Sequence, residues 1–332
     1  MSFLRVASLR PLVCQLLSKV AFSDASFRLL ALVAMRPKRR KKKSNLLPLS
    51  LALSGLGGIA AYVYLNRTIE PLPPALNPDQ FITLPLKKVV PYNHNSSTFV
   101  FELPPKTSSK LPVASCLVVR ATDPEALKSN GNPVVRPYTP VETKDNTNEL
   151  VLLVKKYETG VMSKYMHEMK PGDTLDVKGP IPKFPYKENE FDEVALIGGG
   201  SGITPLYQVL THALSSRFNT TKFKLLYSNV TEQDILLREE LDALAKKYPS
   251  TLEVVYLLDK PGNDWKGPSG FVNADVIKKY VAPPTQQRTM VMVCGPPPQV
   301  ASIAGKKAGM KQGPLGGVLK ELGYTEEQVF KF

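Results

Sequence analysis

Four short motifs hold the residues of this chain that are best suited to chemistry. In order, they are Arg136-Pro137-Tyr138-Thr139-Pro140, Gly160-Val161-Met162-Ser163, Gly198-Gly199-Gly200-Ser201-Gly202-Ile203-Thr204-Pro205 and Cys294-Gly295-Pro296-Pro297. They contribute a cation, glycine-rich backbone and a thiol, and the first three suit close contact with phosphate. No motif is specific alone, but their order predicts two phosphate-bearing cofactors held next to each other by two consecutive domains.

The first motif offers a guanidinium at the end of a predicted strand. Alternation along a strand places Arg136 and Tyr138 on one face, with Thr139 pointing the other way. A guanidinium suits a pyrophosphate because it donates in a planar fork and keeps its charge. Taken alone, this motif is better explained by an edge-strand arginine beside a packed tyrosine. Only the later motifs favour a phosphate site.

The second motif opens a predicted helix that runs to about Met169. The first backbone N–H groups of a helix lack partners and attract an anion, and the Ser163 hydroxyl can add a hydrogen bond. Met162, Met166 and Met169 recur at helical spacing. They are therefore expected to form the core face of this helix rather than a cofactor site.

The third and fourth motifs each follow a predicted strand. The third departs from the strict G-x-G-x-x-G fingerprint, because Ile203 or Pro205 takes the place of the last glycine. It still has small residues where a backbone must approach a phosphate, and Pro205 suits the first turn of a helix. In the fourth motif, Cys294 ends a strand before a rigid turn. The simpler explanation for Cys294 is a small buried residue at a strand end.

Residues 76–185 are predicted to form the first catalytic domain, an antiparallel β-barrel. Short runs rich in β-branched and aromatic residues are separated by Pro, Gly and Asn turns at regular spacing. The expected strands cover residues 98–103, 116–120, 134–138, 150–157 and 174–178. Such a barrel can hold an extended dinucleotide on its face.

Residues 190–332 are predicted to form a second domain of the Rossmann-like α/β class. The expected strands cover residues 194–198, 222–228, 252–258 and 289–294, and the expected helices cover 205–216, 236–247 and 274–280. Uniformly apolar strands such as Val194-Ala195-Leu196-Ile197 indicate a buried parallel sheet with helices on both faces. Ligands of such sheets bind at the carboxyl ends of the strands, where the third and fourth motifs lie.

Asp259 follows the apolar run of residues 254–258. An acid near the adenosine ribose accepts a hydrogen bond from the 2′-hydroxyl and repels a 2′-phosphate, which favours NADH over NADPH. The adjacent Lys260 weakens this inference.

The order and spacing of the four motifs resemble those of the NADH-cytochrome b5 reductases, which belong to the ferredoxin-reductase-like superfamily. About 60 residues separate the first motif from the third, and about 90 separate the third from the fourth. The resemblance covers residues 81–332, and the C-terminal run of residues 323–332 strengthens it. With its extra N-terminal segment, the chain is similar to the mitochondrial form of the family. The resemblance implies FAD and NADH as cofactors.

The resemblance also implies roles for individual residues. Arg136 binds the flavin phosphate, Tyr138 contacts the ribityl or ring part, and Thr139 hydrogen-bonds near flavin N5. Lys155 and Tyr157 lie at the junction of flavin and nicotinamide, and Cys294 lies beside the nicotinamide. The catalytic residues are thus expected to be Thr139, Lys155 and Cys294. The expected cofactor contacts are Arg136, Pro137, Tyr138, Thr139, Lys155, Tyr157, Gly160, Val161, Met162, Ser163, Gly199, Gly200, Gly202, Thr204, Pro205, Asp259, Cys294, Gly295, Pro296 and Pro297.

One position departs from the family pattern. Many members have a lysine where this chain has Val161, and that lysine is associated with docking of acidic cytochrome b5. The departure puts the docking surface in doubt and leaves the flavin site unaffected. The family also places the position of Phe271 near the nucleotide.

The charge of the chain is concentrated at its N-terminus. Residues 1–43 carry a net charge of +10, whereas the other 289 residues carry +4. Nucleic acid is therefore not expected as a partner. Cys14, Cys116 and Cys294 are widely spaced, which predicts neither a disulfide framework nor a metal cluster. The three histidines are equally scattered, so no metal site is expected.

Residues 1–45 have the composition of a mitochondrial targeting segment followed by a basic cluster at residues 36–43. Basic residues lie among Ser and Leu in residues 1–35, where Asp24 is the single acid. A disordered basic tail without targeting meaning is the alternative.

Residues 46–65 carry no charge and are long enough for a helix to cross a hydrocarbon core of about 30 Å. A buried helix of a soluble protein is the alternative to this predicted single membrane span. Residues 66–75 form a Pro-rich linker. The basic cluster before the span places the C-terminal part on the opposite side of the membrane. The expected location is the mitochondrion, either at the outer membrane or at the inner membrane with the catalytic part in the intermembrane space.

Together these features predict a membrane-anchored FAD enzyme that takes a hydride from NADH and passes single electrons to cytochrome b5 or a similar haem protein. The catalytic part is expected to be monomeric. One alternative is an NADH-dependent reductase of a quinone or another carrier. Another is a non-catalytic, membrane-tethered flavoprotein, which the intact motifs around Arg136 and Cys294 disfavour.

Overall fold

The computed structural model describes residues 72–141, 148–285 and 288–332. The chain divides into two units, Met1–Glu70 and Pro71–Phe332, and every described residue belongs to the second. The predicted targeting segment at residues 1–45 and the predicted span at residues 46–65 lie outside the described residues. Among the residues that are described, no helix is both long and apolar enough to cross a membrane.

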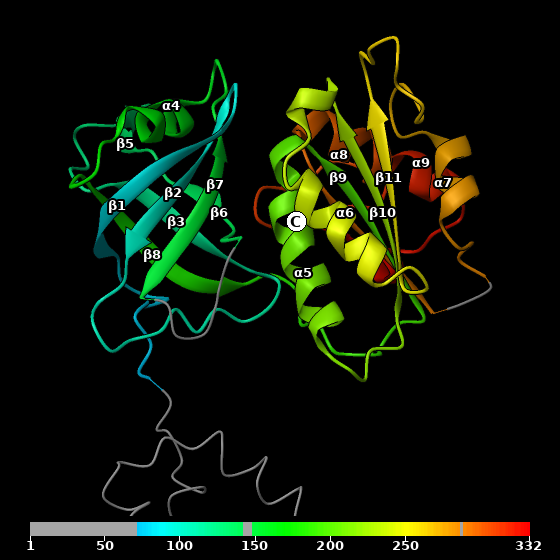
Figure 1. The fold of residues 1–332 in the computed structure, drawn as a ribbon, viewed down its shortest axis with the longest axis horizontal. Coiled ribbons are helices and arrows are strands. Elements are labelled where there is room, and N and C mark those ends of the chain that lie inside the picture. Colours follow the sequence, from blue (N-terminus) through cyan, green and yellow to red (C-terminus); the bar gives the residue numbers. More distant parts are fainter. Residues whose placement is uncertain (1–71, 142–147, 286–287) are drawn as a thin grey trace, which may run out of the picture. The chain divides into compact units, whose positions relative to one another are not determined.

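The first lobe, residues 72–186, is built on an antiparallel sheet (Figure 1). Six strands form this sheet within the described residues, in the order β6-β3-β8-β1-β2-β7. Their bounds are β1 (Ile82–Asn93), β2 (Ser96–Glu102), β3 (Ser115–Ala121), β6 (Arg136–Tyr138), β7 (Glu149–Lys155) and β8 (Thr174–Pro182). A short hairpin of β4 (Lys128–Ser129) and β5 (Asn132–Pro133) and the helix α4 (Val161–Glu168) complete the lobe.

The predicted antiparallel β architecture of this lobe is confirmed. Strands β6 and β7 lie at the two ends of the strand order. One backbone hydrogen bond, from the N–H of Val141 to the carbonyl of Val151 at 3.2 Å, links the segment after β6 to β7. The core includes Phe99 and Phe101, and it also includes Met162 and Met166 of α4. The prediction that the methionines form the core face of this helix is therefore confirmed.

The longest strand, β1, was not among the predicted strands. Its inward residues Leu84 and Leu86 are buried, but Lys87, Lys88 and Pro91 interrupt the pattern that a sequence shows for a strand. The pairing with β2 shifts register at Leu86/Lys88 and again after Pro91. Proline is tolerated in a sheet at such bulges, so tertiary pairing overrides the weak local signal.

The second lobe, residues 187–332, is an α/β domain with a fully parallel sheet, as predicted (Figure 1). Within the described residues, five strands follow the order β11-β10-β9-β12-β13. The strands are β9 (Glu193–Gly199), β10 (Lys222–Asn229), β11 (Leu252–Leu258), β12 (Thr289–Cys294) and β13 (Val329–Lys331). The helices are α5 (Ile203–Ser215), α6 (Arg238–Lys247), α7 (Ala274–Tyr280), α8 (Pro297–Ala304) and α9 (Gly317–Glu321).

Both faces of this sheet are covered by helices. Along β9, Val194 and Leu196 pack in one apolar cluster, and Ala195 and Ile197 pack in another. Helices α5 and α6 contribute to the first cluster, and α7, α8 and α9 contribute to the second. Burial on both faces explains why the strands are apolar throughout instead of alternating.

Strand β13 and helix α8 were not predicted. Strand β13 has only three residues and contains Lys331, which is buried. The Lys331 Nζ donates to the carbonyls of Ala304, Gly313 and Pro314 at 3.0–3.4 Å. These carbonyls stabilise a lysine that sequence patterning would assign to the surface.

The strand order of the parallel sheet changes direction between β9 and β12. These strands are neighbours, and Cys294 pairs with Gly198. Helix α5 leaves β9 toward one face, whereas α8 leaves β12 toward the other. The strand order therefore changes direction here, which is where open parallel sheets form their binding crevice.

Candidate functional site

The turn after β9 and the loop after β12 are packed backbone against backbone. A Cβ on Gly202 would lie 2.3 Å from the carbonyl oxygen of Cys294. A Cβ on Gly295 would lie 3.3 Å from the Cα of Gly199. Glycine is therefore required at Gly202 for the third and fourth motifs to meet. Gly200 differs, because only the Tyr157 hydroxyl comes within 4 Å of its Cβ position.

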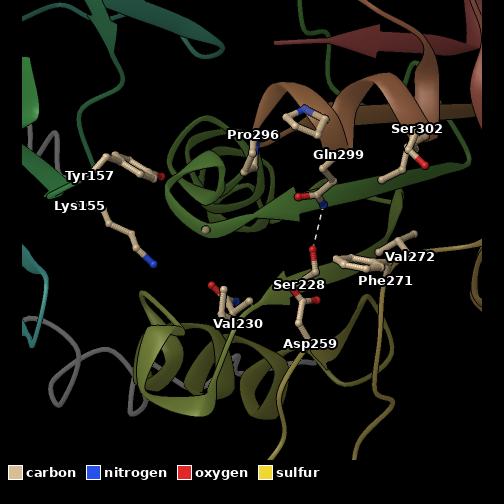
Figure 2. A pocket seen from close by; sticks show the side chains of 14 residues that line it. Lys155, Tyr157, Ser228, Val230, Asp259, Phe271, Val272, Pro296, Gln299 and Ser302 are labelled. Atoms are coloured by element: carbon tan, nitrogen blue, oxygen red, sulfur yellow. Dashed lines mark hydrogen bonds between the residues drawn. The ribbon is translucent and has the colours of Figure 1, made fainter. Parts of the chain in front are cut away.

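Two hydrogen-bonding side chains, the buried Tyr227 and the partly buried Gln299, hold this turn in place. The Tyr227 hydroxyl donates to the carbonyl of Gly200 at 2.9 Å and accepts from the N–H of Leu236 at 3.2 Å. The Gln299 Nε2 donates to the Ser228 Oγ at 2.9 Å and to the carbonyl of Gly198 at 3.3 Å (Figure 2). The turn is thus supported by β10 from one side and by α8 from the other.

A cavity of about 420 Å³ opens beside this turn. Its lining includes Ser228 and Asn229 at the end of β10, Asp259 after β11, and Gln299 and Ser302 of α8 (Figure 2). The side-chain amide of Asn229 is buried and has no hydrogen-bond partner among the described residues. A bound polar ligand can satisfy that amide, so the lining suits a dinucleotide.

Asp259 lies on the wall of this first cavity, as its position at a strand end predicted. Its backbone N–H donates to the carbonyl of Asn229 at 3.0 Å. Burial raises the pKa of its carboxyl group, and the neighbouring Lys260 opposes that effect. Phe271, which also lines the cavity, is 75% exposed. Its ring is therefore free to contact a ligand.

A second cavity of about 510 Å³ lies where the two lobes meet. The first lobe contributes Pro137, Tyr138, Thr139, Lys155 and Tyr157 to its lining. The second lobe contributes Gly202, Thr204, Pro205, Cys294, Gly295, Pro296 and Pro297. The first, third and fourth motifs are therefore brought together. Lys155, Tyr157 and Pro296 line both cavities, so the two spaces adjoin.

Tyr138 and Cys294, on the walls of the second cavity, keep their protons near neutral pH. Burial raises the pKa of the Tyr138 hydroxyl to about 12, although nearby Arg136 opposes it. Burial also raises the pKa of the Cys294 thiol to about 12. Cys294 is therefore neutral at physiological pH and is not a thiolate nucleophile. The Tyr157 hydroxyl lies 2.7 Å from the Ser201 Oγ, which ties the two lobes together at the cavity.

Arg136 and the second motif do not line either cavity. Arg136 is exposed, and its Nη1 donates to the carbonyl of Val135 at 2.8 Å. It makes no ion pair with a carboxylate among the described residues, so its charge is available to an anion. The exposed guanidinium fits a phosphate-bearing cofactor such as FAD.

Helix α4 begins as predicted, directly after Gly160, without a side-chain cap. Met162 is buried in the core, so it can offer only its backbone to a cofactor, while Val161 is exposed. The Ser163 hydroxyl donates to the carbonyl of Gly160 at 3.0 Å and accepts from the N–H of Tyr157 at 3.1 Å. That hydroxyl is thus used within the turn, and the uncapped backbone N–H groups are the donors open to a phosphate.

Several lining residues were missed by sequence reasoning. Ser228 ends a predicted strand of a parallel sheet and Asn229 follows it directly, and such positions mark ligand contacts. Gln299 and Ser302 belong to α8, whose start was signalled by prolines 296–298. Lys183, Lys307, Met310 and Phe332 also line the second cavity, and no local pattern identifies them.

Comparison with known proteins agrees with this two-lobe arrangement. Residues 83–186 match a family of oxidoreductase FAD-binding domains, and residues 196–305 match a family of oxidoreductase NAD-binding domains. NADH-cytochrome b5 reductase 2 of Mycosarcoma maydis is 44% identical over 310 residues, covering 86% of this chain and 88% of the relative. An Arabidopsis thaliana NADH-cytochrome b5 reductase-like protein is 41% identical, covering 81% of this chain and 83% of the relative.

Among solved structures, the cytochrome b5 reductase domain of Ulva prolifera nitrate reductase is similar to this chain. It is 30% identical with a TM-score of 0.66, and the match covers 78% of this chain and 100% of that domain. The human Ncb5or CS-b5R structure, at 24% identity and a TM-score of 0.62, shares the fold.

The contact between Gly202 and Cys294 generates a direct test. Gly202 has φ −65°, so alanine adds steric conflict there without backbone strain. We expect Gly202→Ala to lower the free energy of unfolding by about 1–3 kcal/mol, because one methyl group is forced into filled space. Denaturant unfolding of the full-length protein measures it. Gly262→Ala, where nothing lies within 4 Å of the added Cβ, is the control and should change stability by less than about 0.5 kcal/mol. Equal stability of the two variants would contradict the assigned contact.

Proposed function

Because the chain belongs to the NADH-cytochrome b5 reductase family, we propose that it is a membrane-anchored enzyme that passes electrons from NADH through FAD to a haem protein of the cytochrome b5 type. It is an NADH-dependent oxidoreductase with FAD as its flavin. The observation that carries the proposal is the second cavity. There, Tyr138 and Thr139 of the FAD-binding lobe face the loop from Cys294 to Pro297 of the NAD-binding lobe.

The FAD site is assigned to the first lobe. Arg136 offers its exposed guanidinium to the pyrophosphate, and the backbone from Gly160 to Ser163 offers uncapped N–H groups. Pro137 and Tyr138 line the space for the ring system, and the nearly buried Thr139 hydroxyl is placed for the N5 region. When bound, FAD supplies the acceptor for a hydride and releases the electrons singly.

The NADH site is assigned to the second lobe. Gly199 and Gly200, together with Gly202, Thr204 and Pro205, form the turn and helix start that face the pyrophosphate side of the dinucleotide. Asp259 faces the adenosine ribose, and the segment from Cys294 to Pro297 borders the nicotinamide. Lys155 and Tyr157 border both cavities and so lie at the junction of the two cofactors.

Positioning is the main task of these residues. Cys294 Sγ and Tyr138 Oη both hold their protons at neutral pH, so neither serves as a base there. Hydride transfer needs no general base. This agrees with a reaction in which the protein contributes orientation.

The experiment that tests the function uses purified full-length protein loaded with FAD. The yellow protein should bleach on anaerobic addition of NADH and should reoxidise with ferricyanide. Turnover with cytochrome b5 should exceed turnover with a soluble quinone. If NADH does not bleach the flavin, the proposed enzymatic function is wrong. If turnover with the quinone is faster than with cytochrome b5, the acceptor is a quinone and not a haem protein.

The anchoring and the location rest on the N-terminal sequence. The uncharged run of residues 46–65 supports a single span, and the basic residues before it support a mitochondrial location with the catalytic part across the membrane from the N-terminus. Carbonate extraction of mitochondria tests both points. Protein released into the supernatant would rule out the span, and absence from the mitochondrial fraction would rule out the location.

Arg136 generates a prediction about FAD affinity. Removing its charge-assisted phosphate contacts in Arg136→Ala should cost on the order of 2 kcal/mol, or about thirtyfold in Kd. Fluorescence titration of the FAD-free protein with FAD measures the change. Arg217→Ala removes an exposed arginine of the second lobe and should leave Kd unchanged. If Arg136→Ala retains all of its FAD after dialysis, Arg136 does not bind the FAD phosphate.

Asp259 generates a prediction about the choice of donor. A 2′-phosphate would meet a carboxylate in a partly desolvated site, so NADH should be preferred over NADPH. We expect a ratio of at least about tenfold in kcat/KM, equivalent to about 1.4 kcal/mol. Asp259→Ser should lower the ratio of kcat/KM for NADH to that for NADPH, chiefly by raising kcat/KM for NADPH. Asp264→Ser, in the exposed loop nearby, should leave the ratio unchanged. An unchanged ratio in Asp259→Ser would show that this residue does not contact the ribose.

A further inference from the structure

The two lobes are joined by polar contacts that neither the motifs nor the proposed cofactor sites include. The turn between β1 and β2 in the first lobe lies against residues 231–237 of the second. Asn93 Nδ2 donates to the carbonyl of Gln233 at 2.9 Å. The N–H of Leu237 donates to the Tyr92 hydroxyl at 2.8 Å.

Asp234 lies at the centre of this junction, with its side chain 8% exposed. Its Oδ1 accepts from Lys155 Nζ at 2.8 Å and from Asn95 Nδ2 at 3.1 Å. Its Oδ2 accepts from the Thr231 hydroxyl at 2.7 Å and from the Thr231 N–H at 3.0 Å. The His94 ring lies 3.6 Å from Oδ1. Oδ1 is therefore occupied by donors from the first lobe, and Oδ2 by donors of Thr231 in the second lobe.

These donors keep the carboxylate ionised. Burial by itself would raise the pKa of Asp234, but the hydrogen bonds from Lys155, Thr231 and Asn95 outweigh burial and hold the pKa well below its usual range. Asp234 therefore carries its charge at any pH at which the enzyme works. It is a fixed counter-ion rather than a proton donor.

The partner of Asp234 is the lysine that borders both cavities. Lys155 ends β7, its side chain is 13% exposed, and its ammonium is the only described cation that lines both cavities (Figure 2). A long lysine side chain has many rotamers, and ordering it costs conformational entropy. Asp234 fixes one of those rotamers from across the lobe boundary.

We propose that Asp234 is a positioning residue for hydride transfer, which acts by holding the Lys155 ammonium at the junction of the two cofactor cavities. This inference rests on the proposed function, because it assigns Lys155 a place beside the reacting groups. It adds a residue outside all four motifs, on a short turn of the NAD-binding lobe, to the machinery that sets their geometry. Misplacing a positioning group by about 1 Å can cost up to about 100-fold in rate.

The first test is the near-isosteric Asp234→Asn in FAD-loaded, full-length protein. Asparagine keeps an acceptor for Asn95 but removes the charge that holds Lys155. We expect anaerobic stopped-flow reduction of the flavin at saturating NADH to slow at least tenfold. The FAD content and the NADH concentration for half-maximal rate should change less than threefold. A wild-type rate would overturn the proposal.

The matched control is Glu232→Gln. Glu232 lies in the same short turn as Asp234, but its carboxylate is exposed and pairs with Arg238 on the surface. An exposed pair of this kind contributes little, so Glu232→Gln should reduce flavin at the wild-type rate. Equal slowing in both variants would mean that the turn, and not the counter-ion, matters, which would overturn the proposal.

A double-mutant cycle shows whether Asp234 acts through Lys155. Lys155→Met should slow flavin reduction, and Asp234→Asn added to it should slow the reaction no further. Additive effects would mean that Asp234 acts only as a structural tie between lobes, and the assignment would fail.

A second variant keeps the proposal testable where Asp234→Asn does not fold. Thr231→Val removes one hydroxyl donor to Asp234 and leaves both charges in place. We expect it to slow flavin reduction about threefold in the wild-type background and not in Lys155→Met; slowing in both backgrounds or in neither would overturn the proposal. If NADH fails to reduce the wild-type flavin, the proposed function fails, and that result is distinct from every outcome of the cycle.

Discussion

The structure depends on one steric constraint, the contact between Gly202 and the carbonyl of Cys294. Strands β9 and β12 are neighbours, and the helices that follow them depart to opposite faces of the sheet. The turn after one strand and the loop after the other must therefore share the space between them. The missing side chain at Gly202 makes that possible. The two loops then form one rigid wall, which Tyr227 and Gln299 support from behind.

Apolar contacts and hydrogen bonds both hold the first lobe against this wall, and they have different effects. Ala114 and Leu153 of the first lobe are buried within the apolar cluster of the second. Around this seam lie directional bonds, including Ser115 N–H to Gln208 Oε1 at 3.0 Å and the pair of Tyr157 and Ser201. Apolar burial supplies most of the stabilisation, whereas the hydrogen bonds select a single orientation. The cavity between the lobes owes its shape to that orientation.

The protonation states of the groups around the cavities also favour positioning over acid–base chemistry. Tyr138 and Cys294 keep their protons, and the ionised Asp234 is saturated by donors. The raised pKa values of Tyr138 and Cys294 mean that neither group acts as a base at neutral pH. Such a site holds reactants in place and leaves the electron chemistry to the cofactors. Asp259 is the carboxylate that lines the first cavity, which supports its proposed role in distinguishing a ribose from a ribose phosphate.

How much could be predicted from the sequence varied along the chain. Residues 252–258, 274–280 and 289–294 form β11, α7 and β12 with the predicted bounds, because uniform apolar runs and helix signals are local. The start of α4 and the family of the chain also followed from short motifs. In contrast, the lysines and prolines of β1 concealed a strand that pairing with β2 and β8 stabilises.

The sequence by itself determined which motifs exist, how each is placed relative to a strand or a helix start, and that two of them lie at the strand ends of the parallel sheet. Tertiary structure alone decided which side chains face one another there. Lys155 and Asp234 are 79 residues apart, and Gln299 and Ser228 are 71 apart. Local patterns report which face of an element is buried, but a pairing over such a distance depends on which surfaces meet when the elements and the lobes pack. For that reason the motifs were visible in the sequence, while the residues that hold them in register were not.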